Sequence, residues 1–202
     1  MAETNHRTDE YGGSYKNRMR FAVEACKRVR AAVPDDFIVV FRLSLLDLVA
    51  GGSTWEEVVE LAHELERNGA TIINSGIGWH EARVPTIATS VPRGGFAWVT
   101  GKLRADAELT IPVCATNRIN TPEIADDIIA RGDADLVSMA RPLLADENFV
   151  NKVRGCVSPL RVPVVAWVAF FSPPCGGVVA AVVANAAAAS AAAVVAAAAR
   201  CR

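Results

Sequence analysis

The sequence of 202 residues lacks the marks of several protein classes. Its 21 lysines and arginines are offset by 22 aspartates and glutamates, so no basic surplus predicts a nucleic-acid partner. Its five cysteines show neither Cys-x-x-Cys spacing nor zinc-like pairing with histidine, and we expect no metal site. The first residues are polar and charged, unlike a secretory signal. We therefore expect a cytoplasmic protein with reduced thiols, in which Cys26 and Cys114 act as small buried apolar residues.

Acidic residues are also absent after Glu147, and from Val178 onward the chain is almost entirely alanine and valine. This change predicts one domain in residues 1–153 and a low-complexity tail in residues 154–202, such as a frame-shifted or truncated gene product would carry. The apolar runs 162–171 and 178–199 leave a membrane hairpin open. Because alanine is weakly hydrophobic and no aromatic belt brackets the second run, we do not expect membrane association.

Residues 1–153 alternate between strand-like and helix-like patterns. The helical segments have plausible N-caps at Ser14 and Thr121, and Pro122 stands at a favoured first helical position. Such alternation predicts an α/β fold with a parallel sheet covered by helices. Four strands are half of an eight-stranded (β/α)8 barrel; an open doubly wound sheet has the same order, although no Gly-x-Gly-x-x-Gly follows any strand. The expected strands are 37–41, 71–74, 111–116 and 134–140, and the expected helices are 15–33, 55–67, 96–103, 122–131 and 144–153.

Basic side chains follow the ends of these predicted strands. Arg42, His80, Arg118 and Arg141 each come just after a strand, and in a barrel such positions converge on one mouth. Each has a simpler interpretation, because a strand-end arginine is often a surface ion-pairing residue and His80 can be an ordinary loop histidine. Glu57, on a helix face, is interpreted as a solvated charge.

Five segments, in this order, resemble the old yellow enzyme family of NADH:flavin oxidoreductases, and most closely its bacterial NADPH-dependent 2,4-dienoyl-CoA reductases. The resemblance covers roughly residues 4–153. The matching segments are Arg7–Arg18, Arg42–Ser44, Gly78–Thr86, Thr116–Asn120 and Asp135–Pro142.

This resemblance implies an FMN-binding TIM barrel that reduces conjugated enoyl- or dienoyl-CoA thioesters by hydride transfer from reduced flavin, as in the degradation of unsaturated fatty acids. Arg42 would lie by the pyrimidine end of the flavin, where a fixed cation favours the anionic hydroquinone. Arg118, Ala140 and Arg141 would hold the FMN phosphate, in keeping with the phosphate sites of TIM barrels.

The same resemblance places His80 at the catalytic centre, where it would assist proton delivery to a substrate carbon. His80, Glu81, Ala82 and Arg83 would line the substrate pocket. We interpret the loop Tyr11–Gly13 as structural.

The sequence also departs from the family pattern. The first half of the barrel, with its catalytic tyrosine, does not precede residue 1, and the cysteine cluster for a 4Fe–4S centre and the FAD- and NADPH-binding domains do not follow. We therefore expect the C-terminal half of a barrel (about strands 5–8), which binds FMN weakly and can self-associate through its open side. Two alternatives stay open: a sibling ene-reductase of the same family, and an inactive truncated half-barrel.

Overall fold

The computed structural model describes residues 1–154, 168–171, 179–182 and 195–196. A parallel sheet is built in sequence order from four strands, each connected to the next through a helix. These strands are β1 (Val40–Leu46), β2 (Ile72–Ile77), β3 (Val113–Ala115) and β4 (Leu136–Met139). Because neighbouring strands follow one another without the reversal that a doubly wound sheet requires, the order is that of a partial barrel.

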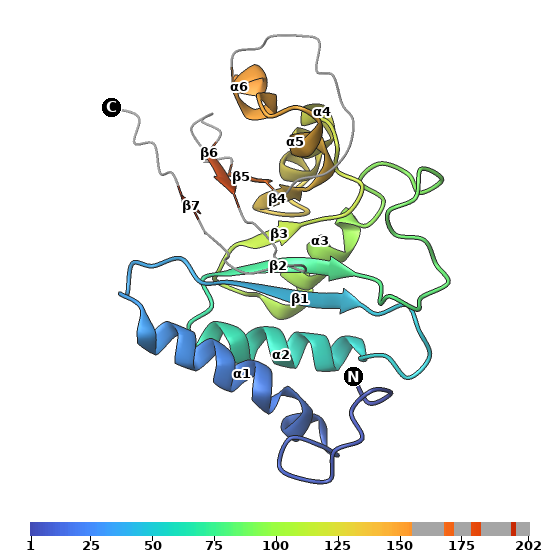
Figure 1. The fold of residues 1–202 in the computed structure, drawn as a ribbon, viewed down its shortest axis with the longest axis vertical. Coiled ribbons are helices and arrows are strands. Elements are labelled where there is room, and N and C mark those ends of the chain that lie inside the picture. Colours follow the sequence, from blue (N-terminus) through green and yellow to red (C-terminus); the bar gives the residue numbers. More distant parts are fainter. Residues whose placement is uncertain (155–167, 172–178, 183–194, 197–202) are drawn as a thin grey trace.

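Helices cover the sheet, with α1 and α2 packed beneath β1 and β2 (Figure 1). Their bounds are α1 (Tyr15–Ala32), α2 (Trp55–Arg67), α3 (Ala97–Ala107), α4 (Pro122–Ala130), α5 (Arg141–Ala145) and α6 (Phe149–Arg154). Three further strands extend the sheet in antiparallel pairing beyond β4. These are β5 (Val168–Phe171), β6 (Val179–Val182) and β7 (Val195–Ala196).

Most of the predicted tail, including Cys156, Cys175 and Cys201, lies outside the described residues, so the division at residue 153 stays a prediction. No helix in the part of the chain that the structure describes combines the length and the apolar character that crossing a membrane requires.

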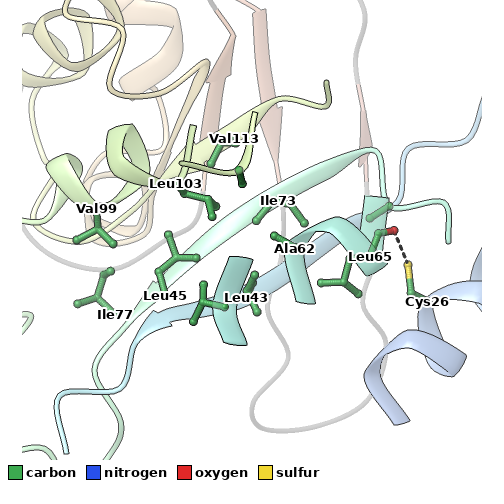
Figure 2. Close-up of a cluster of buried hydrophobic side chains, with 13 residues drawn as sticks. Cys26, Leu43, Leu45, Ala62, Leu65, Ile73, Ile77, Val99, Leu103 and Val113 are labelled. Carbon is green, nitrogen blue, oxygen red and sulfur yellow. Dashed lines mark hydrogen bonds between the residues drawn. The ribbon is translucent and has the colours of Figure 1, made fainter. Parts of the chain in front are cut away.

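The main apolar core lies between the sheet and its helices. Figure 2 shows Leu43 and Leu45 of β1 and Ile73 of β2 pointing toward side chains of α2 and α3, among them Leu65 and Leu103. At the edge of this cluster the thiol of Cys26, on α1, donates to the carbonyl oxygen of Leu65, with sulfur and oxygen 3.9 Å apart. Cys26 is buried, as predicted, and so is Cys114, where burial raises the pKa of the thiol. Neither is a thiolate nucleophile at neutral pH.

The N-terminal loop and α1 are joined to α2 by polar contacts. The Ser14 hydroxyl accepts from the Asn17 N–H, which confirms the predicted cap of α1. The Arg18 guanidinium forms an ion pair with Glu57, and Glu57 also completes a capping box with Thr54 at the start of α2. The interpretation of Glu57 as a solvated charge was therefore wrong. The structural interpretation of the Tyr11–Gly13 loop agrees with a bond from Arg18 to the Gly13 carbonyl.

The first predicted strand was displaced along the chain. It was expected at 37–41, but Phe37 and Ile38 precede β1 and are 46% and 39% exposed. Leu43 and Leu45 face the core while Arg42 and Ser44 do not, so the strand has the period-two pattern of one buried face and extends to Leu46. Arg42 therefore lies within β1, not beyond its end.

Three helix predictions also need correction. The helix expected at 96–103 continues to Ala107, and the side chain of the predicted cap Thr121 accepts no backbone N–H of α4, although it bonds to the Glu123 side chain. The helix expected at 144–153 is divided into α5 and α6. Asp146 lies between them and accepts hydrogen bonds from the Asn148 N–H and from Lys152, so its carboxylate starts a new helix.

Candidate functional site

A cavity of about 440 Å³ lies at the exits of β3 and β4, between the long loop that follows β2 and Arg42 of β1. Four arginines line it, namely Arg42, Arg93, Arg118 and Arg141, and none of the described residues that line it is an aspartate or a glutamate. The remaining lining residues are Ile87, Thr89, Thr116, Asn117, Ile119, Asn120, Ser138, Ala140 and Pro142. This charge distribution favours an anionic ligand.

Arg42 reaches the cavity from within β1. It pairs in register with Asn74 of β2, and its Nε lies 3.6 Å from the point where a Cβ on Gly76 would stand. The Arg42 side chain therefore passes over the neighbouring strand at van der Waals distance from this position. Partial desolvation lowers the pKa of the Arg42 guanidinium, although an arginine remains charged at neutral pH.

Arg118 and Arg141 are oriented by main-chain carbonyls of the long loop between β2 and α3. Arg118 donates from Nε to Val91 O (3.0 Å) and from Nη2 to Thr89 O (3.5 Å). Arg141 donates from Nη1 to Ile87 O (2.9 Å). Two cations that follow different strands are thus attached to one short stretch of backbone, 87–91.

The turn after β3 has an unusual backbone. Asn117 and Arg118 are consecutive non-glycine residues with left-handed φ values of 71° and 58°, a conformation that costs free energy and needs support from its surroundings. Part of that support comes from the side chain of Asn117, whose Oδ1 lies 2.7 Å from the Thr116 hydroxyl and whose Nδ2 lies 3.4 Å from Thr86 O. The turn is therefore attached to the loop after β2 at both residues.

The segment that carries His80 leaves this arrangement. Gly78 has φ +78°, and a Cβ there would stand 2.6 Å from Cγ2 of Thr86, so the chain closes on itself between these two residues. Residues 79–85 form a loop that projects between Gly78 and Thr86, and we call it the 79–85 excursion. His80, Glu81 and Arg83 are exposed and Ala82 is half-buried, and none of the four lines the cavity. The structure thus brings together Arg42, Arg118, Ala140 and Arg141, and places the expected substrate residues outside their cavity.

Several lining residues were not among the candidates from sequence. Asn117 and Asn120 lie in a polar strand exit that could have suggested them, whereas nothing local distinguishes Ile87 or Thr89, whose positions depend on the path of a long loop. Asn120 carries a buried Oδ1 without a hydrogen-bond partner among the described residues. A ligand with both a phosphate group and hydroxyl donors, as FMN has, would suit the arginines and this unpartnered acceptor together.

Comparison with known proteins gives a consistent family. The model of the NADH:flavin oxidoreductase / NADH oxidase family matches residues 1–157. A metal reductase of Desulforamulus reducens is 40% identical over 149 residues, which are 74% of this chain and 22% of that protein. An NADH oxidase of Thermoanaerobacter brockii is 35% identical over 165 residues, covering 77% of this chain and 25% of that protein.

A solved structure of 2-naphthoyl-CoA reductase in complex with 2-naphthoyl-CoA superimposes with a TM-score of 0.71 at 35% identity, covering 76% of this chain and 23% of that one. The chain therefore spans about a quarter of the length of these relatives.

Proposed function

This chain belongs to the NADH:flavin oxidoreductase / NADH oxidase family, and from that premise we propose that residues 1–153 are the C-terminal half of an FMN-binding barrel. In this proposal the complete enzyme is a cytoplasmic reductase of conjugated enoyl- or dienoyl-CoA thioesters, with NADPH as electron donor. The observation that carries it is the cavity lined by four arginines and by no described carboxylate.

The cavity residues divide into two groups. Arg118 and Arg141, with the backbone at Ala140, would hold the phosphate of FMN, because a planar guanidinium matches phosphate oxygens. Arg42, on β1 at the other end of the four parallel strands from β4, would lie at the pyrimidine end of the flavin. Bound FMN would supply the hydride in its reduced form. The protein's part is a preorganised set of cations in a partly desolvated site, which stabilises negative charge.

The thioester substrate is supported by the likeness to 2-naphthoyl-CoA reductase, whose substrate is an aromatic CoA thioester. We propose that His80 donates a proton to the substrate carbon and that Glu81, Ala82 and Arg83 contact the substrate. Their exposed excursion directly follows β2 and is joined at Thr86 to a residue of the cavity, Asn117. The excursion would have to fold over the cavity for His80 to reach a reacting atom.

The exposed edge of β1 suggests that the partner is a second copy of this chain. β1 is the terminal strand of the described sheet, and its outer edge has no strand beside it there. We propose that this edge mediates self-association. Sedimentation of the purified chain tests this: a monomer at all concentrations would contradict it.

Flavin binding is tested with two ligands that differ only in the phosphate. Titration of the chain with FMN and with riboflavin, followed by quenching of flavin fluorescence, is expected to give weak binding with FMN at least about tenfold tighter, since charge-assisted bonds to phosphate are strong. Equal affinities would contradict the assignment of Arg118 and Arg141 to the phosphate.

Substrate class is tested by anaerobic turnover with photoreduced FMN, comparing a 2,4-dienoyl-CoA with cyclohexenone. Faster loss of the dienoyl absorbance supports the thioester reductase. A preference for cyclohexenone would instead support the sibling ene-reductase, and FMN binding without any turnover would support an inactive half-barrel.

A further inference from the structure

Arg118 and Arg141 use some of their N–H groups to bond the loop between β2 and α3 and leave others for a ligand. Arg118 uses Nε and Nη2 for the carbonyls of Val91 and Thr89, and no described residue accepts from its Nη1. Arg141 uses Nη1 for Ile87 O, which leaves Nε and Nη2. Because the guanidinium is a rigid plane with five N–H donors, fixing one edge on the loop also fixes the direction of the remaining donors.

The same loop is also held by two hydrogen bonds that involve no charged group. Asn117 donates to Thr86 O, and the Gly94 N–H donates to Arg118 O at 2.9 Å. Residues 86–94 are thus bonded to Asn117 and Arg118 after β3 and to Arg141 after β4. The 79–85 excursion projects from the start of this stretch. The end of the excursion, at Thr86, is therefore bonded to a side chain that lines the cavity, whereas its start is held by backbone bonds from Gly78 and Trp79 to the carbonyls of Leu46 and Asp47.

We propose that phosphate binding in the cavity and anchoring of the 79–85 excursion are coupled through Arg118 and Arg141, with Asn117 as a positioning residue. The carbonyls of Ile87, Thr89 and Val91 aim the two guanidinium groups, and a phosphate group bound to their remaining donors holds those groups against the loop in return. This inference rests on the proposed phosphate site and adds to it: the ligand's anionic end orders the segment that carries His80. By linkage, phosphate shifts the anchoring equilibrium by the same factor by which the anchored state binds phosphate more tightly than the unanchored state.

Trypsin provides a direct measurement, because the excursion contains an exposed arginine, Arg83, that does not line the cavity. We expect saturating inorganic phosphate, compared with chloride at equal ionic strength, to slow cleavage after Arg83 by at least about fivefold, within the usual range of coupling between sites. FMN is expected to do the same. Cleavage after Arg93 is no test, because Arg93 lines the cavity and would be shielded directly.

Two variants test whether protection at Arg83 depends on the proposed coupling or only on the positive charge of the cavity. Asn117→Gly removes no positive charge and suits the left-handed backbone, yet it is expected to speed cleavage after Arg83 and to weaken phosphate binding about fivefold. Arg141→Lys keeps the charge but loses the planar fork, so it is expected to bind phosphate while losing most of the protection at Arg83. The matched control is Glu108→Gly, a second left-handed residue, at the end of α3, which should change neither measurement.

The outcomes distinguish the two proposals. Protection by phosphate but not by FMN leaves the coupling standing and contradicts the flavin site. Binding of FMN or phosphate without protection at Arg83 overturns the coupling alone, as would an Asn117→Gly variant with faster cleavage and unchanged affinity. Failure of both ligands to bind overturns both.

Discussion

The side of the sheet that faces α1 and α2 and the mouth at the strand ends use polar residues in opposite ways. Beneath the sheet, Arg18 forms an ion pair with Glu57, and Glu57 also completes the capping box of α2, although the buried Nε of Arg18 has no hydrogen-bond partner among the described residues. The core around them consists of large, fully buried side chains. At the mouth, Arg118 and Arg141 are held by loop carbonyls, and some of their N–H groups have no acceptor among the described residues. The buried Oδ1 of Asn120 also has no hydrogen-bond partner there. The ion pair and the cap beneath the sheet stabilise the fold, whereas the unpartnered groups at the mouth are available to bind a ligand.

Backbone strain also differs between the two regions, although one left-handed residue, Glu108, lies away from the mouth at the end of α3. The consecutive left-handed residues Asn117 and Arg118 lie at the mouth, whereas β1 and β2 pair over six residues with a single irregularity. Strained positions persist where surrounding contacts hold them, and they concentrate at ligand sites. The comparison predicts that changes beneath the sheet affect stability, whereas changes at the mouth affect ligands.

The largest expected effect is on the helix-facing core. Leu65 on α2 is completely buried, so Leu65→Ala should lower the free energy of unfolding by about 2–5 kcal/mol through lost burial and a residual cavity. Denaturant unfolding measures this. Leu144→Ala is the control near the mouth: its side chain is 62% exposed, and the change should stay within about 0.5 kcal/mol. Similar effects at the two positions would break the proposed division.

The reverse pattern is expected for Arg141→Ala. Loss of a charge-assisted contact should weaken binding of FMN and phosphate about 10- to 100-fold, while the free energy of unfolding changes by no more than about 0.5 kcal/mol, because Arg141 makes a single bond to a loop carbonyl. Fluorescence titration and denaturant unfolding give the two values. A strongly destabilised variant with normal phosphate affinity would show that Arg141 belongs to the structural side.

The division also explains which features the sequence could predict. The Ser14 cap is a local feature and the strand order follows from β/α alternation, so both were predicted correctly. The position of β1 was missed because a run of apolar residues around Phe37 looked like a buried strand, whereas pairing with β2 continues through Arg42 to Leu46. The strand's limits depend on its neighbour, which a local pattern does not contain.

At the mouth, prediction reached as far as the strand ends. Arg118, Ala140 and Arg141 converge because parallel strands bring their carboxyl ends together, whatever the loops do. Arg42 joins them from within β1, which the strand-end argument did not predict. The path of a long loop depends instead on particular contacts, such as the close approach of Gly78 to Thr86, and His80 in the segment between them does not line the cavity. The catalytic and substrate roles of His80, Glu81, Ala82 and Arg83 stay predictions.

A smaller effect is expected at Glu66, on the side of the sheet covered by α2. Burial raises the pKa of this carboxyl, but hydrogen bonds from the Thr110 hydroxyl and N–H and from the Ile111 N–H outweigh it, and the pKa lies below its ordinary value. A carboxyl with a depressed folded-state pKa stabilises the fold above its unfolded pKa of about 4.3 and loses this contribution as the pH falls through the folded value. Glu66→Gln should therefore cost about 1 kcal/mol at pH 7 and progressively less below about pH 4.

Denaturant unfolding at both pH values measures the Glu66 effect. Glu81→Gln, on the exposed 79–85 excursion and without a hydrogen bond among the described residues, should change the free energy of unfolding by no more than about 0.5 kcal/mol at either pH. A penalty for Glu66→Gln that stays constant down to pH 3 would show that the carboxylate charge contributes nothing there.

The smallest effect compares two left-handed residues. Glu108 ends α3 at φ 47°, a position where glycine is preferred, and Glu108→Gly should stabilise the chain by about 0.5 kcal/mol, since relief of strain is partly offset by the greater freedom of glycine in the unfolded chain. Asn117→Gly gains the same relief but loses the side-chain contacts to Thr116 and Thr86, so its net effect on stability should be near zero or negative. Thermal unfolding of the two variants measures the difference. Equal stabilisation would mean that Asn117 contributes no support to the mouth, and the left-handed turn would then be held by Arg118 and its loop carbonyls alone.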